Sequence, residues 1–417
     1  MDKRRVVITG LGAVTPVGHT AAESWRAVKD GVCGVGPITL FDAEGQKVTL
    51  AAEVKDFDPL LFFEKREAKR MARFTQFAAA AAREALENAA FSKPEGDAAY
   101  RCGIIVSSGI GGLDVTETEC AHTLTHGFGR VSPLYVPMAI CNMAAGRVAI
   151  EAGFRGMCSC PVTACAGGTY AVGDAFRMIR DGYADAMFCG GAEASITPLA
   201  VGGFSSMKAL TTVTDPARAS IPFDAERSGF VIGEGAGILL LEDLESALRR
   251  GAPIIAEMVG YGASCDAYHI TAPRPDGDGA AKAMELALAD GGISPDEVGY
   301  INAHGTSTHL NDACETAAIR RVFGAHANSL AVSSTKSMTG HMLGAAGAVE
   351  AVFTAMALKD AFLPATIHYQ TPDPECDLDV VPNTGRHAEI RYAMSNSLGF
   401  GGHNGSILLK KWEEPAC

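Results

Sequence analysis

The chain has 417 residues, of which 47% are hydrophobic, and its formal net charge is −13 at pH 7. A chain of this length exceeds one ordinary compact domain and can bury a large core. The acidic charge argues against general nucleic-acid binding, because neutralising phosphates requires an excess of lysine and arginine. The cysteines form no CxxC pair, which is typical of reduced thiols in a cytoplasmic protein. No apolar run is long enough to predict a signal peptide or a membrane span.

Several segments of the sequence repeat each other weakly. Two stretches read as helices that end in a turn containing serine and proline, and each leads into a strand that ends in glycine and hydroxyl residues. The matching pairs are 80–95 with 280–297, 102–112 with 298–308, and 229–240 with 399–409. The repetition predicts a duplicated α/β unit with an N-terminal half at 1–252 and a C-terminal half at 253–417.

The first half contains an insertion, roughly residues 112–157, that has no counterpart in the second half. Long insertions lie at the surface of a fold and often carry function. We therefore expect a subunit interface or part of a substrate pocket in this insertion.

Cys165 lies in the segment 162–168, where an apolar run gives way to small residues and then to a helical pattern. A thiol at such a strand-to-helix turn meets the unpaired N–H groups and the positive end of the helix dipole. These lower the pKa of a thiol and favour nucleophilic attack. The alternative is a structural cysteine, because free cysteine is among the most buried residue types.

His304 and His341 each follow a short strand-like run and lie in turns rich in glycine and hydroxyl residues. Either histidine alone is better explained as a core residue. In the repeat, the Cys165 turn pairs with the His341 turn, so the reactive groups should meet between the two halves, at the carboxyl ends of strands. One cysteine and two histidines in such turns predict a covalent thioester site.

Two glycine-rich segments do not predict a nucleotide site. Residues 10–16 lack the third glycine of a dinucleotide-binding turn, and Pro16 stands where the helix should begin. Residues 233–237 lead into a strand, so no helix start is available for a phosphate. The sequence has no HExxH zinc motif, and we expect no metal in the catalytic site.

Five segments together resemble the β-ketoacyl-acyl-carrier-protein synthases, with the synthase II (FabF-type) enzymes as the closest match. In the family's order, the segments are 162–168, 266–269, 302–308, 333–350 and 395–406. The resemblance runs from about Arg4 to Lys411. It implies an α/β thiolase fold, in which duplicated βαβαβαββ halves form a five-layered αβαβα architecture, and a homodimer.

The resemblance also implies the activity. These acyltransferases perform the decarboxylative Claisen condensation of fatty-acid elongation, with acyl carrier protein delivering the acyl and malonyl groups. It implies no resident cofactor, since phosphopantetheine arrives on the carrier protein, and is compatible with a structural monovalent cation. It implies no membrane or nucleic-acid partner.

By resemblance, Cys165 would be the nucleophile, and His304 and His341 would assist decarboxylation and stabilise the enolate. The N–H groups of Cys165 and Phe400 would form the oxyanion hole, and the Phe400 side chain would gate the acyl pocket. Supporting roles are implied for the remaining positions: electrostatics at Lys336 and Glu350; phosphopantetheine binding at Thr271, Thr306 and Thr308; and the acyl pocket at Ile110, Tyr135 and Phe204.

A group of basic residues is the predicted docking site for the acidic carrier protein. It consists of Lys65, Arg66, Lys69, Arg70 and Arg73, at i, i+4 spacings in a predicted helix, with Lys208 and Arg130 added. A solvated helix face is the alternative interpretation.

Three positions depart from the family pattern: Leu398 and His403 stand where phenylalanine and threonine are common, and Leu134-Tyr135 where an aromatic pair is common. These changes concern pocket depth and gating, so the preferred acyl length is left open. A ketosynthase of a polyketide or aryl-polyene pathway would use the same three side chains. A non-catalytic heterodimer partner would lack the cysteine. A thiolase would need a second catalytic cysteine, and Cys376 and Cys417 lack a glycine-rich setting.

Overall fold

Ten strands form one continuous sheet in the computed structural model, which describes residues 3–414. The strands of this sheet are β1 (Val6–Val14), β4 (Cys102–Ser107), β5 (Cys158–Ser159), β6 (Ala186–Glu193), β7 (Gly235–Asp243), β8 (Ala256–Cys265), β9 (Val298–Asn302), β10 (Ala331–Ser333), β13 (Tyr392–Gly399) and β14 (His403–Lys411). Two small two-stranded sheets are formed by β2 (Gly36–Pro37) with β3 (Leu50–Ala51), and by β11 (Phe362–Leu363) with β12 (Arg386–His387).

The strand order of the large sheet is symmetric about its centre. Outward from β1 the neighbours are β7, β6, β4 and β5, and outward from β8 they are β14, β13, β9 and β10. The outer strands of each half are parallel and the inner ones antiparallel. Antiparallel pairing of β1 with β8 joins the halves, from Val6 opposite Met258 to Ile8 opposite Ala256. The duplicated α/β fold expected from the sequence is confirmed.

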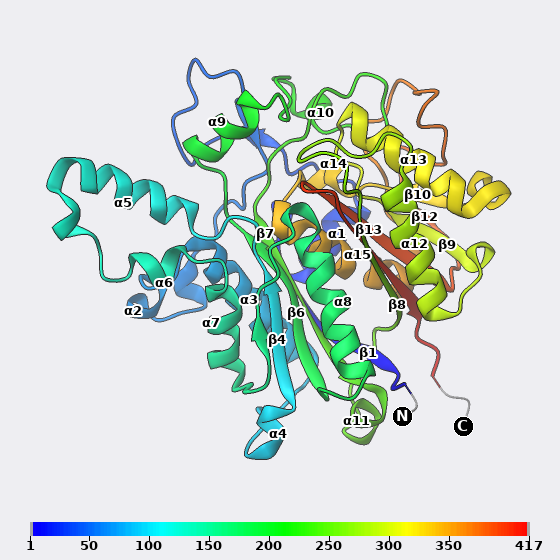
Figure 1. The fold of residues 1–417 in the computed structure, drawn as a ribbon, viewed down its shortest axis with the longest axis horizontal. Helices are drawn as coiled ribbons and strands as arrows, with labels where there is room; N and C mark the ends of the chain where they lie inside the picture. Colours follow the sequence, from blue (N-terminus) through cyan, green and yellow to red (C-terminus); the bar gives the residue numbers. More distant parts are fainter. Residues whose placement is uncertain (1–2, 415–417) are drawn as a thin grey trace.

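Helices cover both faces of this sheet and fill the space between its halves (Figure 1). The α-helices are α1 (Ala21–Lys29), α2 (Lys65–Ala68), α3 (Arg73–Asn88), α4 (Asp97–Tyr100), α5 (Leu113–His126), α6 (Tyr135–Ala139), α7 (Met143–Ala152), α8 (Gly167–Arg180), α9 (Pro198–Ser206), α10 (Pro216–Ala219), α11 (Leu244–Arg249), α12 (Asp278–Gly291), α13 (His309–Phe323), α14 (Lys336–Thr339) and α15 (Ala346–Asp360). The short 3-10 helices are η1 (Pro59–Leu61), η2 (Phe128–Arg130), η3 (Ala164–Ala166), η4 (Pro295–Glu297), η5 (Gly324–Asn328) and η6 (Leu343–Ala345).

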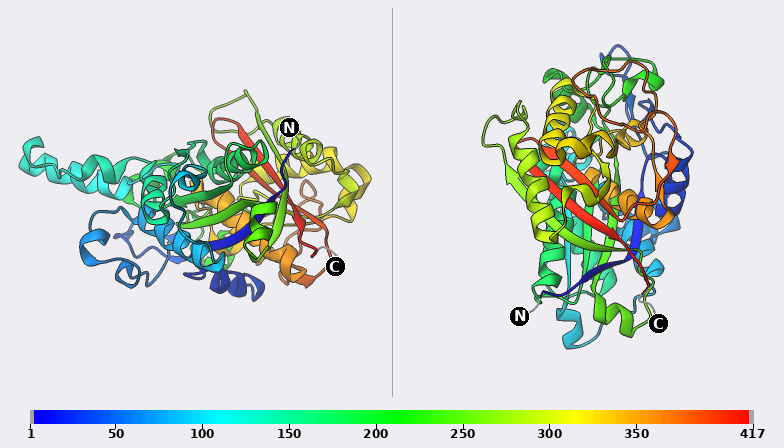
Figure 2. Two further views of the ribbon diagram at one scale, coloured as in Figure 1. Left: turned by 90° about the horizontal axis from the view of Figure 1, so that it is seen from below. Right: turned by 90° about the vertical axis from the view of Figure 1, so that its right-hand side faces the viewer.

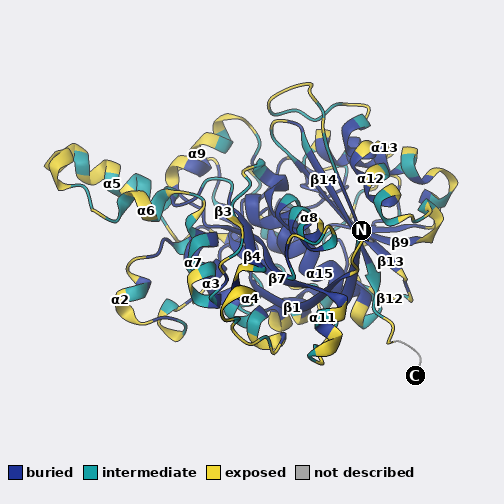
Figure 3. Cartoon of the chain, turned by 60° about the horizontal axis from the view of Figure 1, so that its bottom comes forward, coloured by how far each residue is buried: buried dark blue, intermediate teal, exposed yellow. Residues whose placement is uncertain are grey.

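The elements stack in five layers, as the fold class predicts. Helices α8 and α15 contact each other and strands of both halves, so they form the central layer. Helices α3 and α7 lie outside the first half of the sheet, and α12 and α13 lie outside the second. Figure 3 shows the strands and α15 as the most deeply buried elements.

The composition of the central elements explains their place. From Ala346 to Leu358 every side chain of α15 except Met356 is buried. A helix that is apolar on all sides is stable only when it is enclosed, which the central layer provides. All nine residues of β1 are buried, because both faces of this strand are covered.

The two central helices begin in the same way. Each follows a 3-10 turn whose first residue has a left-handed backbone: Ala164 in η3 has φ 48°, and Leu343 in η6 has φ 46°. This conformation is costly for a residue with a side chain and tends to persist where the surrounding structure requires it. The sequence predicted that the Cys165 turn pairs with the His341 turn. In the structure the Cys165 turn matches η6, the turn that follows His341 and begins α15.

Of the predicted insertion at residues 112–157, the part from α5 to α6 projects from the body of the molecule as an arm, seen at the left of Figure 1 and of the left view of Figure 2, whereas α7 packs against α3 and β4 of the body. No side chain of α5 or α6 is buried, and Leu124 and Phe128 are each 88% exposed.

The described part of the chain contains no helix that is long and apolar enough to cross a membrane. Every cysteine among residues 3–414 is a free thiol. Cys376 is buried in an apolar cluster of the second half, and Cys417 lies outside the described residues.

Candidate active site

A cavity of about 350 Å³ lies between the two halves, and its wall contains Cys165, His304 and His341. Its position follows from the topology. His304 comes two residues after the end of β9, and Phe400 comes directly after β13. The three residues singled out by the sequence therefore meet in one cavity at the carboxyl ends of strands.

Cys165 lies in η3, immediately before α8, and is buried. The backbone N–H groups of Phe400 and of Cys165 itself donate toward its sulfur and lower the pKa of the thiol, as does the charge of Lys336. Burial outweighs them and raises the pKa of Cys165 to about 12. The lowered pKa predicted from the helix dipole is therefore wrong for the free enzyme: the cost of charging a buried sulfur is larger than the stabilisation by the helix start. The Cys165 side chain is therefore a neutral thiol at rest.

The two histidine rings pack edge to face in the cavity wall. Their ring centroids are 5.2 Å apart and the ring planes are almost perpendicular, at 89°. Burial and the charge of Lys336 hold the pKa of both imidazoles well below the ordinary histidine value, and His341 lowers that of His304 further. Neither Nδ1 atom has a hydrogen-bond partner among residues 3–414. Both rings are therefore neutral and can donate a hydrogen bond from one nitrogen.

Besides burial, the charge of Lys336 acts on all three groups and lowers the pKa of Cys165, His304 and His341. It lies in α14, 1% exposed, and its ammonium group is paired with the buried carboxylate of Glu350 on α15. The Ser220 hydroxyl donates a hydrogen bond of 2.7 Å to the Lys336 carbonyl and fixes this segment. A buried positive charge beside the cavity opposes protonation of the imidazoles and favours negative charge on the sulfur.

The loop after β13 closes against the cysteine turn. A Cβ at Gly399 would lie 2.9 Å from the Thr163 carbonyl oxygen and 3.2 Å from the Cys165 nitrogen, so only glycine allows this approach. Phe400 lines the cavity, and its ring centroid lies 6.4 Å from that of Phe204. Leu398, one of the departures from the family pattern, also lines the cavity.

The predicted phosphopantetheine threonines lie in the same wall. Thr271, Thr306 and Thr308 all line the cavity, and the hydroxyl oxygens of Thr306 and Thr308 are 3.0 Å apart. Their hydroxyls can bind the amide groups of a ligand that enters from solvent.

The predicted acyl pocket is only partly assembled by this chain. Phe204 lines the cavity, and Ile110 is half-buried in the apolar cluster that includes Cys165 and Leu343. Tyr135 is not among the described residues that line the cavity: it begins α6 on the projecting arm. The expectation for Tyr135 does not hold within one chain, because the insertion leads away from the body.

The predicted basic helix face is interrupted. Lys65, Arg66, Lys69 and Arg70 are exposed, but α2 ends at Ala68 and a new helix begins at Arg73. The Arg73 guanidinium is paired with the buried carboxylate of Glu234 at 2.7 Å and lies over the Phe77 ring. Arg73 is therefore not part of the exposed surface. The structure places Lys208 at the cavity wall and Arg130 on the arm.

Sequence reasoning missed Glu193, the last residue of β6. Its buried carboxylate accepts hydrogen bonds from the N–H groups of Gly109 at 2.8 Å and Gly344 at 3.0 Å. It thereby fixes the loop that carries Ile110 against the start of α15. A glutamate at the end of an apolar strand was the available signal, since a buried carboxylate requires donors.

The fold and the site define a protein of the thiolase fold with one cysteine and two histidines in the cavity between its halves. Residues 3–247 match the family model described as beta-ketoacyl synthase, N-terminal domain, and residues 255–370 match beta-ketoacyl synthase, C-terminal domain. The chain belongs to the β-ketoacyl synthase family, and the resemblance seen in the sequence is confirmed.

Individual relatives are similar along the whole chain. The 3-oxoacyl-[acyl-carrier-protein] synthase 2 of Synechocystis sp. is 53% identical over 414 residues, which cover 99% of each chain. The ishigamide ketosynthase/chain length factor has a TM-score of 0.91 and 37% identity, covering 99% of this chain and 100% of that one. A type II polyketide-synthase acyl carrier protein in complex with its ketosynthase gives a TM-score of 0.90 and 36% identity, with the same coverage.

Proposed function

We propose that this protein is the condensing enzyme of type II fatty-acid synthesis. It takes an acyl group from acyl carrier protein onto Cys165 and condenses it with malonyl-acyl carrier protein, giving 3-oxoacyl-acyl carrier protein, CO₂ and free carrier protein. The observation that carries the proposal is the meeting of one thiol, two N–H groups and two neutral imidazoles in a single cavity.

In the first step the Cys165 sulfur attacks the thioester carbonyl of the acyl carrier protein. The bond from sulfur to acyl carbon forms, the bond to the pantetheine sulfur breaks, and the thiol proton passes to the departing pantetheine sulfur. The N–H groups of Cys165 and Phe400, which donate toward the sulfur in the resting site, would stabilise the oxyanion that forms on the attacked carbonyl. Because a thiol with a pKa of about 12 is neutral at rest, deprotonation accompanies the attack rather than preceding it.

In the second step the malonyl carboxylate leaves as CO₂ and its electron pair forms an enolate. Hydrogen bonds from His304 and His341 stabilise the enolate oxygen, which requires both rings to carry a proton on one nitrogen and no net charge. The enolate carbon then attacks the acyl thioester, the bond from the acyl carbon to the Cys165 sulfur breaks, and the thiolate that leaves takes up a proton from water, which restores the neutral thiol. Lys336 assists by keeping the pKa of both imidazoles low.

The carrier protein docks beside the cavity mouth. The exposed basic residues Lys65, Arg66, Lys69, Arg70 and Lys208 would attract its acidic surface. The threonines Thr271, Thr306 and Thr308 would bind the phosphopantetheine arm within the cavity. A similar ketosynthase was solved in complex with an acyl carrier protein, which supports a carrier protein as the partner.

We also propose that the enzyme is a homodimer and works in the cytoplasm. The arm exposes Leu124, Phe128 and Val136, which a second subunit would bury. A partner could also bring residues of the arm, Tyr135 among them, to the acyl pocket. Light scattering tests the dimer: a single 43 kDa species at micromolar concentration would contradict it.

Fatty-acid synthesis is favoured over a polyketide pathway by similarity along the whole chain. Identity is 53% with the synthase 2 relative, against 37% with the ishigamide ketosynthase/chain length factor and 36% with the ketosynthase of the type II polyketide complex. A non-catalytic partner is disfavoured because Cys165 is present and lies in the cavity.

The test is to incubate the purified protein alone with acyl- and malonyl-acyl carrier protein and follow 3-oxoacyl-carrier product and CO₂ by mass spectrometry. Formation of both products supports the function. Absence of product with a series of chains from acetyl to palmitoyl would overturn it.

A further inference from the structure

Arg227 is one of the largest fully buried side chains of the protein, at 1% exposure. Its guanidinium is ion-paired with Asp373 and lies 3.6 Å from the carboxylate of Asp312. Burial of an arginine is costly unless its charge and its donors find partners. The two carboxylates compensate the charge of the guanidinium. Its other N–H donors also need acceptors.

The terminal nitrogen that pairs with Asp373 also donates to the Asp224 carbonyl at 2.9 Å, and two further donors hold the backbone of the predicted phosphopantetheine turn. Nε of Arg227 donates to the Thr308 carbonyl at 3.3 Å, and one terminal nitrogen donates to the His309 carbonyl at 3.2 Å. The N–H of Thr306 donates a hydrogen bond to the Asp312 carboxyl, whose pKa burial raises overall. Arg227 and Asp312 together therefore fix the turn that carries Thr306 and Thr308.

Arg227 also directly precedes another segment of the cavity wall. The three residues after it, at 228–230, line the cavity together with Thr306, Thr308 and His309. Gly229 donates its N–H to the Ser307 carbonyl at 3.1 Å, and Ile221 donates to the Ser307 hydroxyl at 3.0 Å. Ser307 has a left-handed backbone, with φ 68°. The threonine turn thus depends on contacts from Ile221, Arg227 and Gly229.

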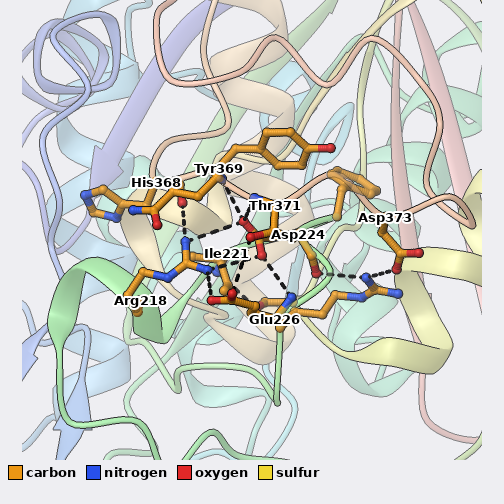
Figure 4. A network of polar contacts seen from close by, with 12 residues as sticks. Arg218, Ile221, Asp224, Glu226, His368, Tyr369, Thr371 and Asp373 are labelled. Carbon is orange, nitrogen blue, oxygen red and sulfur yellow. Dashed lines mark hydrogen bonds and ion pairs between the residues drawn. The ribbon is translucent and has the colours of Figure 1, made fainter.

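A second arginine of the same polar network provides a contrast (Figure 4). Arg218 is paired with Asp224 at 3.2 Å and Glu226 at 2.8 Å and donates to the His368 carbonyl at 2.7 Å. The Asp224 carboxylate accepts from the N–H of Thr371 at 3.0 Å. Arg218 therefore ties the 221–226 segment to the 368–373 loop, and no contact of Arg218 reaches the threonine turn among the described residues.

We propose that Arg227 is a positioning residue for substrate binding: it holds Thr306 and Thr308 in the geometry that receives the phosphopantetheine arm. This role rests on the proposed function. Arginine suits it because the planar guanidinium presents several donors in fixed directions, whereas a lysine offers a compact charge on a flexible stem. Asp373 completes the arrangement by anchoring the guanidinium from the side of the 368–373 loop.

Loss of Arg227 should weaken substrate binding and leave the reactivity of the Cys165 thiol unchanged. Both substrates carry the same phosphopantetheine arm, so a displaced threonine turn weakens the binding of each. Arg227 is not among the groups that shift the pKa of Cys165 or of either catalytic histidine. A small reagent that needs no arm, such as iodoacetamide, should alkylate Cys165 at an unchanged rate.

The experiment compares Arg227→Lys with Arg218→Lys, a matched change in the same network that keeps the charge. For each variant we measure the KM for octanoyl-phosphopantetheine in the acylation of Cys165, the KM for malonyl-acyl carrier protein, the rate of alkylation by iodoacetamide, and Tm. Arg227→Lys should raise both KM values about ten-fold, the loss expected when a charged donor leaves its acceptors, with alkylation within about two-fold of wild type. Arg218→Lys should leave both KM values within about two-fold.

Asp373→Asn serves as a second variant if Arg227→Lys does not fold, and it should raise both KM values in the same direction by a smaller factor. Equal KM values in Arg227→Lys, Asp373→Asn and wild type would overturn the role of Arg227. Equal effects of the two lysine variants on KM, with a parallel loss of alkylation, would reduce Arg227 to a structural residue and overturn it as well. A wild type that takes no acyl group would overturn the proposed function together with this role.

Discussion

The turn that holds Cys165 and the turn that begins α15 have the same backbone but different chemistry. Each is a 3-10 turn that opens with a left-handed residue, Ala164 or Leu343, and leads into a central helix. The next position is Cys165 in the first turn and Gly344 in the second. The duplicated fold therefore supplies two equivalent positions for a nucleophile, and only one is used.

The strand ends beside the two turns differ in a complementary way. Beside Gly344 stands Glu193 at the end of β6, and its carboxylate accepts the Gly344 N–H at 3.0 Å. Beside Cys165 stands Gly399 at the end of β13, which has no side chain and so brings the next N–H, that of Phe400, to the sulfur. In the second turn a carboxylate consumes the N–H group. In the first, the N–H groups are left for the reacting atoms.

The fold therefore supplies the backbone of both turns, and a few side-chain exchanges supply the reactivity of the first. Removing the chemical groups of the first turn should abolish activity. Disturbing the packing of the end of β13 against the first turn should lower activity less.

The largest effect is expected for Cys165→Ala, which gives the first turn the inert character of the second. Acyl transfer and condensation should fall by at least about 10⁴-fold, because no other thiol lines the cavity wall of the described residues. Product formation measured by mass spectrometry checks this. Cys33→Ala, a cysteine of the same protein away from the cavity, is the control and should stay near wild type; condensation retained in Cys165→Ala would contradict the account.

His304→Ala and His341→Ala should each reduce condensation by about 10²- to 10⁴-fold, since each removes a donor to the enolate oxygen. The acyl adduct on Cys165 should still form, because the first step uses the N–H groups of the first turn. Intact-mass measurement of the adduct and CO₂ release separate the two steps. An adduct that fails to form in either variant would assign that histidine to the acylation step as well.

The loops that follow β4 and β9 are each held by a buried carboxylate. Glu315 holds the loop after β9 by accepting hydrogen bonds from the His304 and Gly305 N–H groups, at 2.9 Å each. Burial raises the pKa of Glu315 to about 7, above its ordinary value of 4.5. With a raised carboxyl pKa, the stabilisation is fully present below a pH of about 4.5 and is lost as the pH rises through about 7.

Wild type should therefore lose up to about 3 kcal/mol of unfolding free energy through this group between pH 5 and pH 8, and Glu315→Gln should not. Urea unfolding at the two pH values measures the difference between the proteins. Glu87→Gln, at an exposed position of α3, is the control and should follow wild type. A pH dependence that is the same in wild type and Glu315→Gln would refute the assignment.

The smallest effect is expected for Gly399→Ala, which adds a methyl group between the strand end and the first turn. The Cβ would lie 2.9 Å from the Thr163 carbonyl oxygen, so the Phe400 N–H must move away from the sulfur. Acylation should slow about ten-fold with Cys165 intact, as for a weakened oxyanion donor. Gly146→Ala, where a Cβ meets nothing within 4 Å, is the matched control. Equal acylation rates in the two variants would count against the fit at Gly399.

Much of the site was predictable because its signals are local. Cys165, His304 and His341 each lie in a short motif after a strand-like run, and the repeat indicated that they would meet. The wrong or incomplete predictions all depended on distant contacts. The pKa of Cys165 follows from its burial, Arg73 is bound to Glu234 across 161 positions of the chain, and Tyr135 depends on the direction of the arm. The role of Glu193 required knowing which backbone N–H groups would surround it.

The most direct test of the central claim is peptide mapping after incubation with acyl carrier protein carrying chains from acetyl to palmitoyl, without malonyl donor. The account predicts one acyl group per chain, attached to the peptide that contains Cys165, and none in the Cys165→Ser variant at neutral pH. An acyl group on any other cysteine, or none with any chain, would contradict the claim that the first turn alone is the reactive one.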